Sequence, residues 1–267
     1  MTIGFIGNGN MGRAIISGII DNKVADAREI IVSDIDKEGL EWINSKYGVV
    51  TATDNKIIAK AADILFLCVK PQFLYGVIDE IKENVQKDVV IVSIAAGQSI
   101  TAIENAFGKE IKLVRVMPNT PVLVGEGMSA IASNDNVNNN ELEIVFKIFN
   151  SFGKGEKVSE NLMDAVTAVS GSSPAYVFMM IEAMADAAVI GGMPRDKAYI
   201  FAAQAVMGSA KMVLETRLHP GKLKDMVCSP SGTTIDAVAV LERNGFRSSI
   251  IDAMTACIEK SKKLGEN

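Results

Sequence analysis

The chain has 267 residues, a net charge of −5 and 48% hydrophobic residues, so it is long enough for two domains with a buried core. The negative charge argues against a general nucleic-acid-binding protein and against attraction to an anionic membrane. Cys68, Cys228 and Cys257 are widely spaced and odd in number, which favours a reducing compartment and no metal site. Because signal-peptide features and apolar segments of about 18 residues are lacking, we expect a cytoplasmic protein.

The first glycine-rich segment predicts a dinucleotide-binding turn. Gly7, Gly9 and Gly12 have the spacing G-x-G-x-x-G, after a short apolar run and before a helical pattern that begins near Asn10. In such a turn the first glycine permits a tight bend, the second lets a pyrophosphate approach, and the third lets the helix pack on the strand. The helix N-terminus attracts the phosphates. A glycine turn without a ligand is the alternative, but its position between a strand and a helix favours a nicotinamide enzyme.

A second strand is expected over 29–33, and it ends at Asp34. Such folds place a carboxylate here that binds the adenine ribose, and this carboxylate would repel a 2′-phosphate and favour NAD over NADP. Lys37 is nearby and softens this preference. Asp34 could equally cap a helix that begins near Asp36.

The alternation of strands and helices continues to about residue 150. We expect helices over 40–47, 55–62, 74–84 and 141–150, and strands over 63–69, 89–93, 113–117 and, as an edge strand, 128–132. The run 63–69 is almost entirely apolar, as in a parallel strand buried on both faces. The turns that follow these strands would lie at the carboxyl edge of the sheet, where open α/β sheets bind ligands. The pattern predicts a doubly wound Rossmann-type parallel sheet over residues 1–157.

Residues 158–267 have helical spacing and are expected to form an all-helical substrate-binding and dimerisation domain. The segment 174–189 is apolar on almost every side; being too short to span a bilayer, it is expected to be buried in protein. A second helix over 194–215 carries a surface of small residues, namely Ala202, Ala203, Ala205, Gly208, Ser209 and Ala210. We expect a homodimer, with packing on the first domain alone as the alternative.

Two hydroxyl-rich clusters, 170–176 and 229–235, stand at the start of apolar helices. They indicate anion-binding helix N-termini for a carboxylate-bearing substrate, although ordinary N-capping uses the same residues. The only histidine, His219, precedes Pro-Gly and is expected to be a turn residue. Reduction of a ketone usually needs an acid such as Lys, His or Tyr, but the single histidine is not in a convincing site and no G-x-x-x-K follows the serine-rich turn at 170–172. An iminium substrate, which becomes neutral when it accepts a hydride, therefore suits the chain better than a ketone.

The whole chain resembles the pyrroline-5-carboxylate reductase family, which makes proline from its cyclic imine precursor. The resemblance is carried by the motifs at 5–12, 69–71, 115–121, 164–167, 170–172, 174–176, 219–221 and 229–234. It implies that Thr234 faces the ring nitrogen of pyrroline-5-carboxylate as the proton donor, and that Glu160 lies near the bound proline product. It also implies NADPH or NADH as the cofactor, and dimers that assemble further into decamers.

The resemblance and the glycine turn together supply the expected binding residues. The substrate-binding residues are Ser172, Ser229, Gly232, Thr233 and Thr234, and the cofactor-binding residues are Gly7, Asn8, Gly9, Asn10, Met11, Gly12, Ser33, Asp34, Asn55, Cys68, Val69, Lys70, Pro71, Ala95 and Ala96.

The chain departs from the family pattern at a few positions. Ser173 and Ser231 stand where the family usually has glycine, so a glycine-only backbone angle would be strained there. Met226 replaces an asparagine of some relatives. Asp34-Ile35 stands where many bacterial members of the family have an Asn-Arg pair, and the loss of this arginine agrees with use of NADH or of both cofactors.

Three other readings stay open from the residues alone. A β-hydroxyacid dehydrogenase of the same architecture needs a lysine in the helix after the serine-glycine turn, and this chain has none there before Lys197. An imine reductase acting on a different ring would differ only in pocket volume. A catalytically inactive nucleotide sensor would bind the cofactor without turnover.

Overall fold

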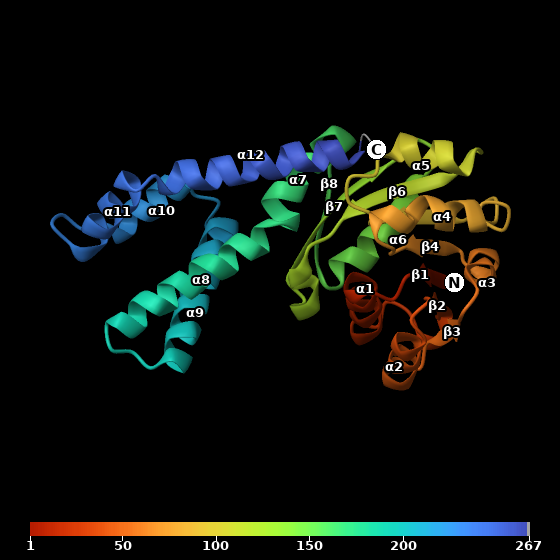
Figure 1. The fold of residues 1–267 in the computed structure, drawn as a ribbon, viewed down its shortest axis with the longest axis horizontal. Helices are drawn as coiled ribbons and strands as arrows, with labels where there is room; N and C mark the ends of the chain where they lie inside the picture. Colours follow the sequence, from red (N-terminus) through yellow and green to blue (C-terminus); the bar gives the residue numbers. More distant parts are fainter. Residues whose placement is uncertain (266–267) are drawn as a thin grey trace. The chain divides into compact units, whose positions relative to one another are not determined.

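The computed structural model describes residues 1–265, and the chain divides into two compact units (Figure 1). Unit 1 contains Met1–Ser172 and the end of the chain from Cys257, and unit 2 contains Ser173–Ala256. This division by contacts falls after Ser172 rather than after residue 157, and it returns the last helix turns to unit 1. The functional assignment of residues 1–157 and 158–267 stays a prediction.

Unit 1 alternates strands and helices along the chain. Its strands are β1 (Ile3–Ile6), β2 (Ile30–Ser33), β3 (Val50–Ala52), β4 (Ile64–Leu67), β5 (Val90–Ser93), β6 (Lys112–Met117), β7 (Gly127–Ser133) and β8 (Gly153–Lys157). Its α-helices before residue 158 are α1 (Asn10–Asp21), α2 (Lys37–Tyr47), α3 (Asn55–Ala61), α4 (Pro71–Ile81), α5 (Ile100–Phe107) and α6 (Asn139–Asn150). Short helical turns are η1 (Ala27–Glu29) and η2 (Thr120–Val124).

The eight strands form one sheet in the order β3-β2-β1-β4-β5-β6-β7-β8. Neighbours from β3 to β6 pair in parallel, β7 is antiparallel to β6, and β8 pairs in parallel with β7. The doubly wound Rossmann-type sheet is therefore confirmed. The expectation that 128–132 is an edge strand is wrong, because β8 pairs with the other side of β7 and is itself the edge strand. Strand β8 has the polar sequence Gly-Lys-Gly-Glu-Lys, which carries no apolar pattern.

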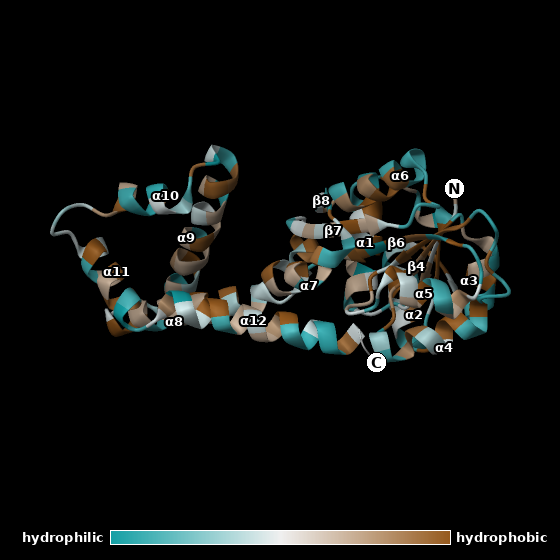
Figure 2. Cartoon of the chain, turned by 90° about the horizontal axis from the view of Figure 1, so that it is seen from above, coloured by the Kyte–Doolittle hydropathy of each residue, from teal (hydrophilic) through white to brown (hydrophobic). Residues whose placement is uncertain are grey.

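Helices cover both faces of the sheet and bury its apolar strands. One core cluster joins side chains of α1, α2 and α6 to one face, and a second joins α3, α4 and α5 to the other. Strands β1 and β4 are buried along their whole length, as expected for parallel strands between two helix layers. Figure 2 shows β4, at the centre of the sheet, largely in the brown of hydrophobic residues. This packing fixes the carboxyl ends of β1, β4, β5 and β6 at one edge.

A helical run leaves the sheet after β8. It consists of η3 (Glu160–Leu162), α7 (Met163–Val166) and the π-helical turn η4 (Thr167–Gly171), and it leads to Ser172, the last residue of this part of unit 1. A π-helical turn is rare and occurs mostly as an insertion near functional sites. No periodic pattern predicts this turn, because five residues are too few to establish a repeat.

Unit 2 consists of helices. They are α8 (Ser173–Ile190), α9 (Arg195–Thr216), α10 (Pro220–Val227), α11 (Thr233–Arg243) and α12 (Phe246–Gly265), whose last turns belong to unit 1. Helices α8 and α9 pack against each other (Figure 1). Ala185 and Ala198 are buried, as is Ala202 from the predicted small-residue surface, while large apolar side chains such as Phe178 and Phe201 are exposed. The sequence predicts that α8 is buried in protein, but within the single chain Ala185 is its one buried residue.

The run Glu160–Ile190 is 31 residues long and, by length and composition only, apolar enough to cross a membrane. The expectation that this segment is too short is wrong, because η3, α7 and η4 extend α8 toward its N-terminus. Helices that are covered by protein pass the same test of length and composition.

Candidate active site

The turn after β1 has the geometry of a dinucleotide cradle. Gly7 has φ +102°, and a Cβ there would lie 2.7 Å from the backbone carbon and oxygen of Cys68. A Cβ at Gly12 would lie 2.6 Å from the carbonyl oxygen of Gly7, so α1 packs directly on the turn. A Cβ at Gly9 would meet nothing within 4 Å, which leaves the backbone open to a phosphate. Asn10 and Met11 begin α1, so their N–H groups have no partner within the helix.

Asn8 links this turn to the loop after β2. Its side chain is 2% exposed, its Nδ2 donates to the carbonyl oxygen of Gly39 at 2.7 Å, and its backbone N–H donates to Asp34. Among the buried side-chain nitrogen and oxygen atoms of the described residues, its Oδ1 is the one without a hydrogen-bond partner. Because leaving a buried acceptor unpaired is costly, this atom can accept a hydrogen bond from a ligand or water at the turn.

The carboxylate of Asp34 is held by two backbone N–H groups. Its Oδ2 accepts from Asn8, and its Oδ1 accepts from Asp36 at 2.9 Å. Asp36 is the N-cap of α2, so Asp34 stabilises the turn that precedes the helix. A carboxylate offers about four lone-pair sites, so two of them stay available for ribose hydroxyls. The interpretation of Asp34 as the helix cap is therefore wrong, because Asp36 is the N-cap of α2 and its amide, rather than an amide within the helix, donates to Asp34. The contact of Asp34 with the ribose stays a prediction.

Ser33 and Asn55 form a second contact at the end of β2. Ser33 is fully buried, and its hydroxyl donates to Oδ1 of Asn55 at 2.7 Å. The Asn55 Nδ2 donates to Glu80 at 2.9 Å. Ser33 therefore orients Asn55, and its carbonyl oxygen accepts from the N–H of Gly7 at 2.8 Å, so it supports the glycine turn from within the protein.

The turns after β4 and β5 lie beside the glycine turn. Cys68, Val69 and Lys70 follow β4, and Pro71 begins α4. The N–H of Ile94 donates to the carbonyl oxygen of Leu67 at 3.3 Å, which brings the turn at Ala95 and Ala96 to the same edge. Burial raises the pKa of the Cys68 thiol, so this side chain is a neutral packing group against the glycine turn.

The serine-rich turn, residues 170–172, is attached to the same edge of the sheet through contacts with the end of β6 and the residues after it. Asn119, just after β6, donates from Nδ2 to the hydroxyl of Ser170 at 3.2 Å and accepts from the N–H of Met128 at 2.8 Å. A Cβ at Gly171 would lie 2.5 Å from the methyl group of Met117. Asn119 was not among the predicted site residues, although its position after a strand, like that of Lys70, was the available signal.

The N–H of Ser172 is already used, because it donates to the carbonyl oxygen of Thr167 at 2.8 Å. Its hydroxyl accepts from the Cys257 thiol at 3.3 Å. Ser172 can therefore bind a substrate carboxylate through its hydroxyl rather than through its own amide.

Glu160 makes structural contacts. Its Oε1 accepts from Nη1 of the buried Arg115 at 2.9 Å and from the backbone N–H of Ile100 at 2.6 Å. It therefore joins β6 and the N-terminus of α5 to the start of the helical run. Arg115 is the second residue that the sequence analysis did not assign to the site.

The hydroxyl-rich loop before α11 lies in unit 2. Gly232 is the N-cap of α11, and a Cβ there would lie 2.3 Å from the hydroxyl oxygen of Ser229. Thr233 and Thr234 form the first turn of α11, whose N-terminal amides can bind an anion. Ser231 has φ +56°, which confirms strain at one of the two predicted glycine replacements; Ser173 lies in α8 without such an angle.

His219 is an N-cap residue, as a turn assignment predicts. Its Nδ1 accepts from the N–H of Gly221 at 3.1 Å at the start of α10. This role leaves the chain's single histidine as a structural group.

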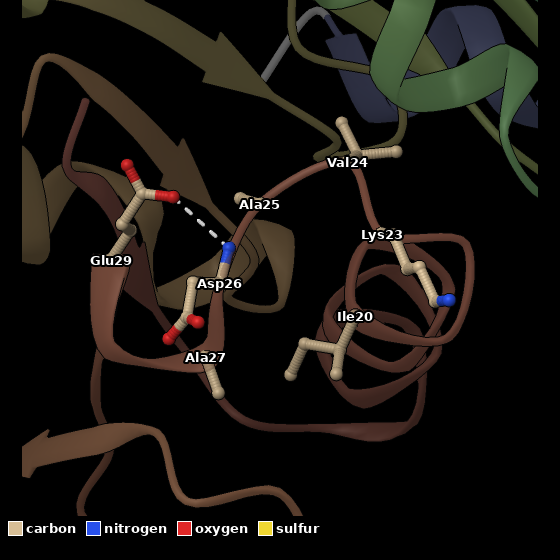
Figure 3. A pocket seen from close by; sticks show the side chains of 7 residues that line it. All are labelled: Ile20, Lys23, Val24, Ala25, Asp26, Ala27 and Glu29. Carbon is tan, nitrogen blue, oxygen red and sulfur yellow. Dashed lines mark hydrogen bonds between the residues drawn. The ribbon is translucent and has the colours of Figure 1, made fainter.

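Two hollows lie away from the glycine turn. The first, about 530 Å³, is lined by residues of the end of α1 and of η1, namely Ile20, Lys23, Val24, Ala25, Asp26, Ala27 and Glu29 (Figure 3). These segments precede β2 and therefore lie at the amino edge of the sheet, opposite the ligand edge. The second, about 380 Å³, lies between α8 and α9 beside the exposed Phe178 and Met179.

Unit 1 therefore brings together the glycine turn, the turns after β4 and β5, Asn119 and the segment 170–172 with its two serines at one edge. A dinucleotide and a carboxylate can be bound there by backbone amides and hydroxyls.

Comparisons with known proteins agree with this site. A family model described as pyrroline-5-carboxylate reductase dimerisation matches residues 160–264, and one described as NADP oxidoreductase, coenzyme F420-dependent, matches residues 2–97. The chain is 51% identical to the pyrroline-5-carboxylate reductase of Escherichia coli strain K12, over 99% of this chain and 98% of that protein. It is 44% identical to the enzyme of Methanosarcina acetivorans, again over 99% and 98% of the two chains.

Solved structures give the same result. The crystal structure of Plasmodium falciparum pyrroline carboxylate reductase with NADP bound matches with a TM-score of 0.91 and 35% identity, covering 99% of this chain and 98% of that chain. Identity of this extent over the whole length, together with the glycine turn and the serine-rich turn at one sheet edge, establishes the family. The chain belongs to the pyrroline-5-carboxylate reductases.

Proposed function

We propose that this protein reduces 1-pyrroline-5-carboxylate to L-proline with NADPH or NADH, the last step of proline biosynthesis. The observation that carries the proposal is the hydrogen bond from Asn119 to Ser170, which attaches a serine-rich turn to the sheet edge that carries the glycine cradle. A site with both features suits a small carboxylate that accepts a hydride from a dinucleotide.

The residues around the glycine turn fit a dinucleotide. The open space at Gly9 and the unpaired Oδ1 of Asn8 offer room for a phosphate and an acceptor for a hydroxyl. The first amides of α1 would bind the pyrophosphate, and Asp34 with Asn55 would face the adenosine ribose. When bound, the reduced nicotinamide supplies the hydride.

The chain's own residues would bind the substrate at its two polar ends. In unit 1 the hydroxyl of Ser172, and in unit 2 the hydroxyl of Ser229 and the first amides of α11 after Gly232, would each offer hydrogen-bond donors to a carboxylate. The hydroxyl of Thr234 would donate to the ring nitrogen, which becomes an amine as the C=N bond is reduced. In the neutral imine the ring nitrogen has a lone pair that accepts this hydrogen bond, and the amine forms as the hydride adds to carbon and a proton adds to nitrogen.

The partners and compartment follow from the same proposal. The family model for dimerisation supports self-association, and we propose a homodimer that assembles into a decamer in the cytoplasm. A second copy of the chain, rather than lipid or nucleic acid, would cover the exposed apolar helices of unit 2.

The first test is steady-state oxidation of NADH and NADPH, in parallel, with pyrroline-5-carboxylate as substrate. Turnover with either cofactor supports the proposal. Cofactor binding without turnover would contradict it and favour a different imine, to be tested with a six-membered cyclic imine, or an inactive sensor.

Thr234 provides the second test. We expect Thr234→Ala to lower kcat by about 100-fold, the low end of general acid catalysis, because the hydroxyl acts at the reacting nitrogen. Thr234→Ser should retain most activity, and the Kd of NADPH should stay unchanged in both variants. Thr216→Ala, which removes an exposed hydroxyl at the end of α9, is the control. Near-normal turnover of Thr234→Ala would remove Thr234 from the mechanism.

A further inference from the structure

The C-terminal turns of α12, from Cys257 to Gly265, pack on the segments of unit 1 that carry site residues. The Cys257 thiol donates to the hydroxyl of Ser172 at 3.3 Å. The hydroxyl of Ser261 donates to Oδ1 of Asp164 at 2.6 Å, and Ser261 is only 5% exposed. Both contacts lie within unit 1.

These two contacts hold the π-helical turn from both ends. Cys257 and Ser261 are one helical turn apart and therefore share a face of α12. Asp164 lies in α7, just before the π-helical turn, and Ser172 directly follows that turn. Since π-helical turns are rare alternatives to regular α-helix, outside contacts at both ends help to select this conformation.

The contact with Cys257 also determines what Ser172 can do. A serine hydroxyl has one hydrogen to donate and two lone pairs to accept with. Because the thiol occupies an acceptor site and the Ser172 amide is used by Thr167, the hydroxyl hydrogen stays available for an anion. The bond from Ser261 to a carboxylate is charge-assisted and short, and therefore the stronger of the two anchors.

A third contact connects the same helix end to the turn after β5. Gly97 has φ +75°, and a Cβ there would lie 3.1 Å from Cβ of Leu264. The last turn of α12 thus lies against the turn that follows Ala95 and Ala96. The end of α12 therefore contacts both Ser172 and the turn after β5, which carries the predicted cofactor residues Ala95 and Ala96.

We propose that Cys257 and Ser261 are positioning residues that hold Ser172 in the orientation needed to bind the substrate carboxylate. This proposal rests on the proposed function, in which Ser172 contacts that carboxylate. Neither residue touches the reacting atoms, so their effect is on substrate binding rather than on hydride transfer.

The test compares full-length variants by their KM for pyrroline-5-carboxylate, their kcat and their Kd for NADPH. We expect Ser261→Ala and Cys257→Ala to raise KM about tenfold and about threefold, following the strengths of a charged and a weak hydrogen bond. We expect kcat to change less than about twofold, and the Kd of NADPH to stay unchanged. Cys257→Ser, which keeps a donor, should restore KM. Thr255→Ala, which removes an exposed hydroxyl of α12 bonded only within the helix, is the control.

Ser172→Ala separates this proposal from the proposed function. If wild-type protein turns over and Ser172→Ala leaves KM unchanged, the assignment of Ser172 to the substrate fails. If Ser172→Ala raises KM but neither α12 variant does, the positioning role is overturned. It is also overturned if kcat, KM and Tm change together without rescue by Cys257→Ser. Comparison of Cys257→Ala with Cys257→Ser tests the positioning role even if Ser261→Ala does not fold.

Discussion

The carboxylate of Asp34 accepts two backbone hydrogen bonds beside the glycine turn. These bonds come from the amides of Asn8 and Asp36, and so they fix the glycine turn before any cofactor binds. The same negative charge lies after β2, where dinucleotide folds recognise the adenosine ribose. A substitution here should therefore change both loop stability and cofactor choice.

We expect Asp34→Ser to weaken binding of both cofactors and to raise the ratio of kcat/KM for NADPH over NADH about tenfold. The ratio rises because the 2′-phosphate no longer meets a carboxylate, a repulsion of about 1.4 kcal/mol for a tenfold change. Asp88→Ser, before β5 at the opposite edge, is the control. An unchanged ratio would mean that Asp34 does not face the 2′ position.

Ser231 carries backbone strain that glycine would relieve. At φ +56° a serine is in the left-handed region, which costs about 1 kcal/mol relative to glycine. Because glycine also has a more flexible unfolded state, we expect Ser231→Gly to raise the free energy of unfolding by about 0.5 kcal/mol, measured by urea denaturation.

Lys23, also at φ +56° but outside the site, provides the comparison. Lys23→Gly should stabilise the protein by a similar amount and leave the kinetic constants unchanged. A loss of stability in Ser231→Gly would show that the serine side chain compensates for its backbone angle.

Among the elements, the start of the helical run is fixed by Glu160. The buried Arg115 on β6 and the first amide of α5 share the same carboxylate oxygen. Removing one partner of a poorly exposed pair leaves the other unpaired, which is costly. The contacts therefore favour a positioning role for Glu160, whereas its resemblance to an acidic residue near bound proline favours a catalytic one.

We expect Glu160→Ala to lower the free energy of unfolding by about 2 kcal/mol, because Arg115 loses its partner and α5 loses an N-terminal acceptor. Glu160→Gln should be milder, since its amide oxygen can still accept. The check is urea unfolding at fixed protein concentration, with Arg115→Met and the double variant to measure coupling. Unchanged stability together with an altered pH profile of kcat would contradict the structural role.

At the scale of the whole molecule, unit 2 cannot form a core from one chain. The buried residues within 173–256 are the alanines 185, 198 and 202, while Phe178, Met179 and Ile200 are more than 60% exposed. Exposed apolar surface of this extent marks an interaction face, which agrees with the dimerisation family model over 160–264.

We therefore expect a solution mass of at least twice the 28.5 kDa of the chain, and a Tm that rises with protein concentration, because association stabilises the folded state. Light scattering after size exclusion and thermal unfolding at several concentrations measure both. Phe201→Glu should weaken association, whereas Ile57→Glu on α3 of unit 1 should not. A monomeric mass with a concentration-independent Tm would contradict this prediction.

The sequence by itself determined the dinucleotide turn, most of the parallel strands and the family. These features are local: glycine spacing, apolar runs and helix starts are read from neighbouring residues. Motifs such as 229–234 and the glycine turn are specific because their backbone geometry admits few side chains. The strain at Ser231 followed from the resemblance, because the family usually has glycine at this position.

Only the tertiary structure decided which distant groups meet. The place of β8 beside β7, the partners of Asp34 and Glu160, and the attachment of Ser170 to Asn119 all depend on contacts between segments far apart in sequence. Such pairings leave no periodic trace, because a polar strand or a single hydrogen bond is specified by its partner's position rather than by its own neighbours. The same holds for the end of α12, where Cys257 contacts Ser172 and Ser261 contacts Asp164.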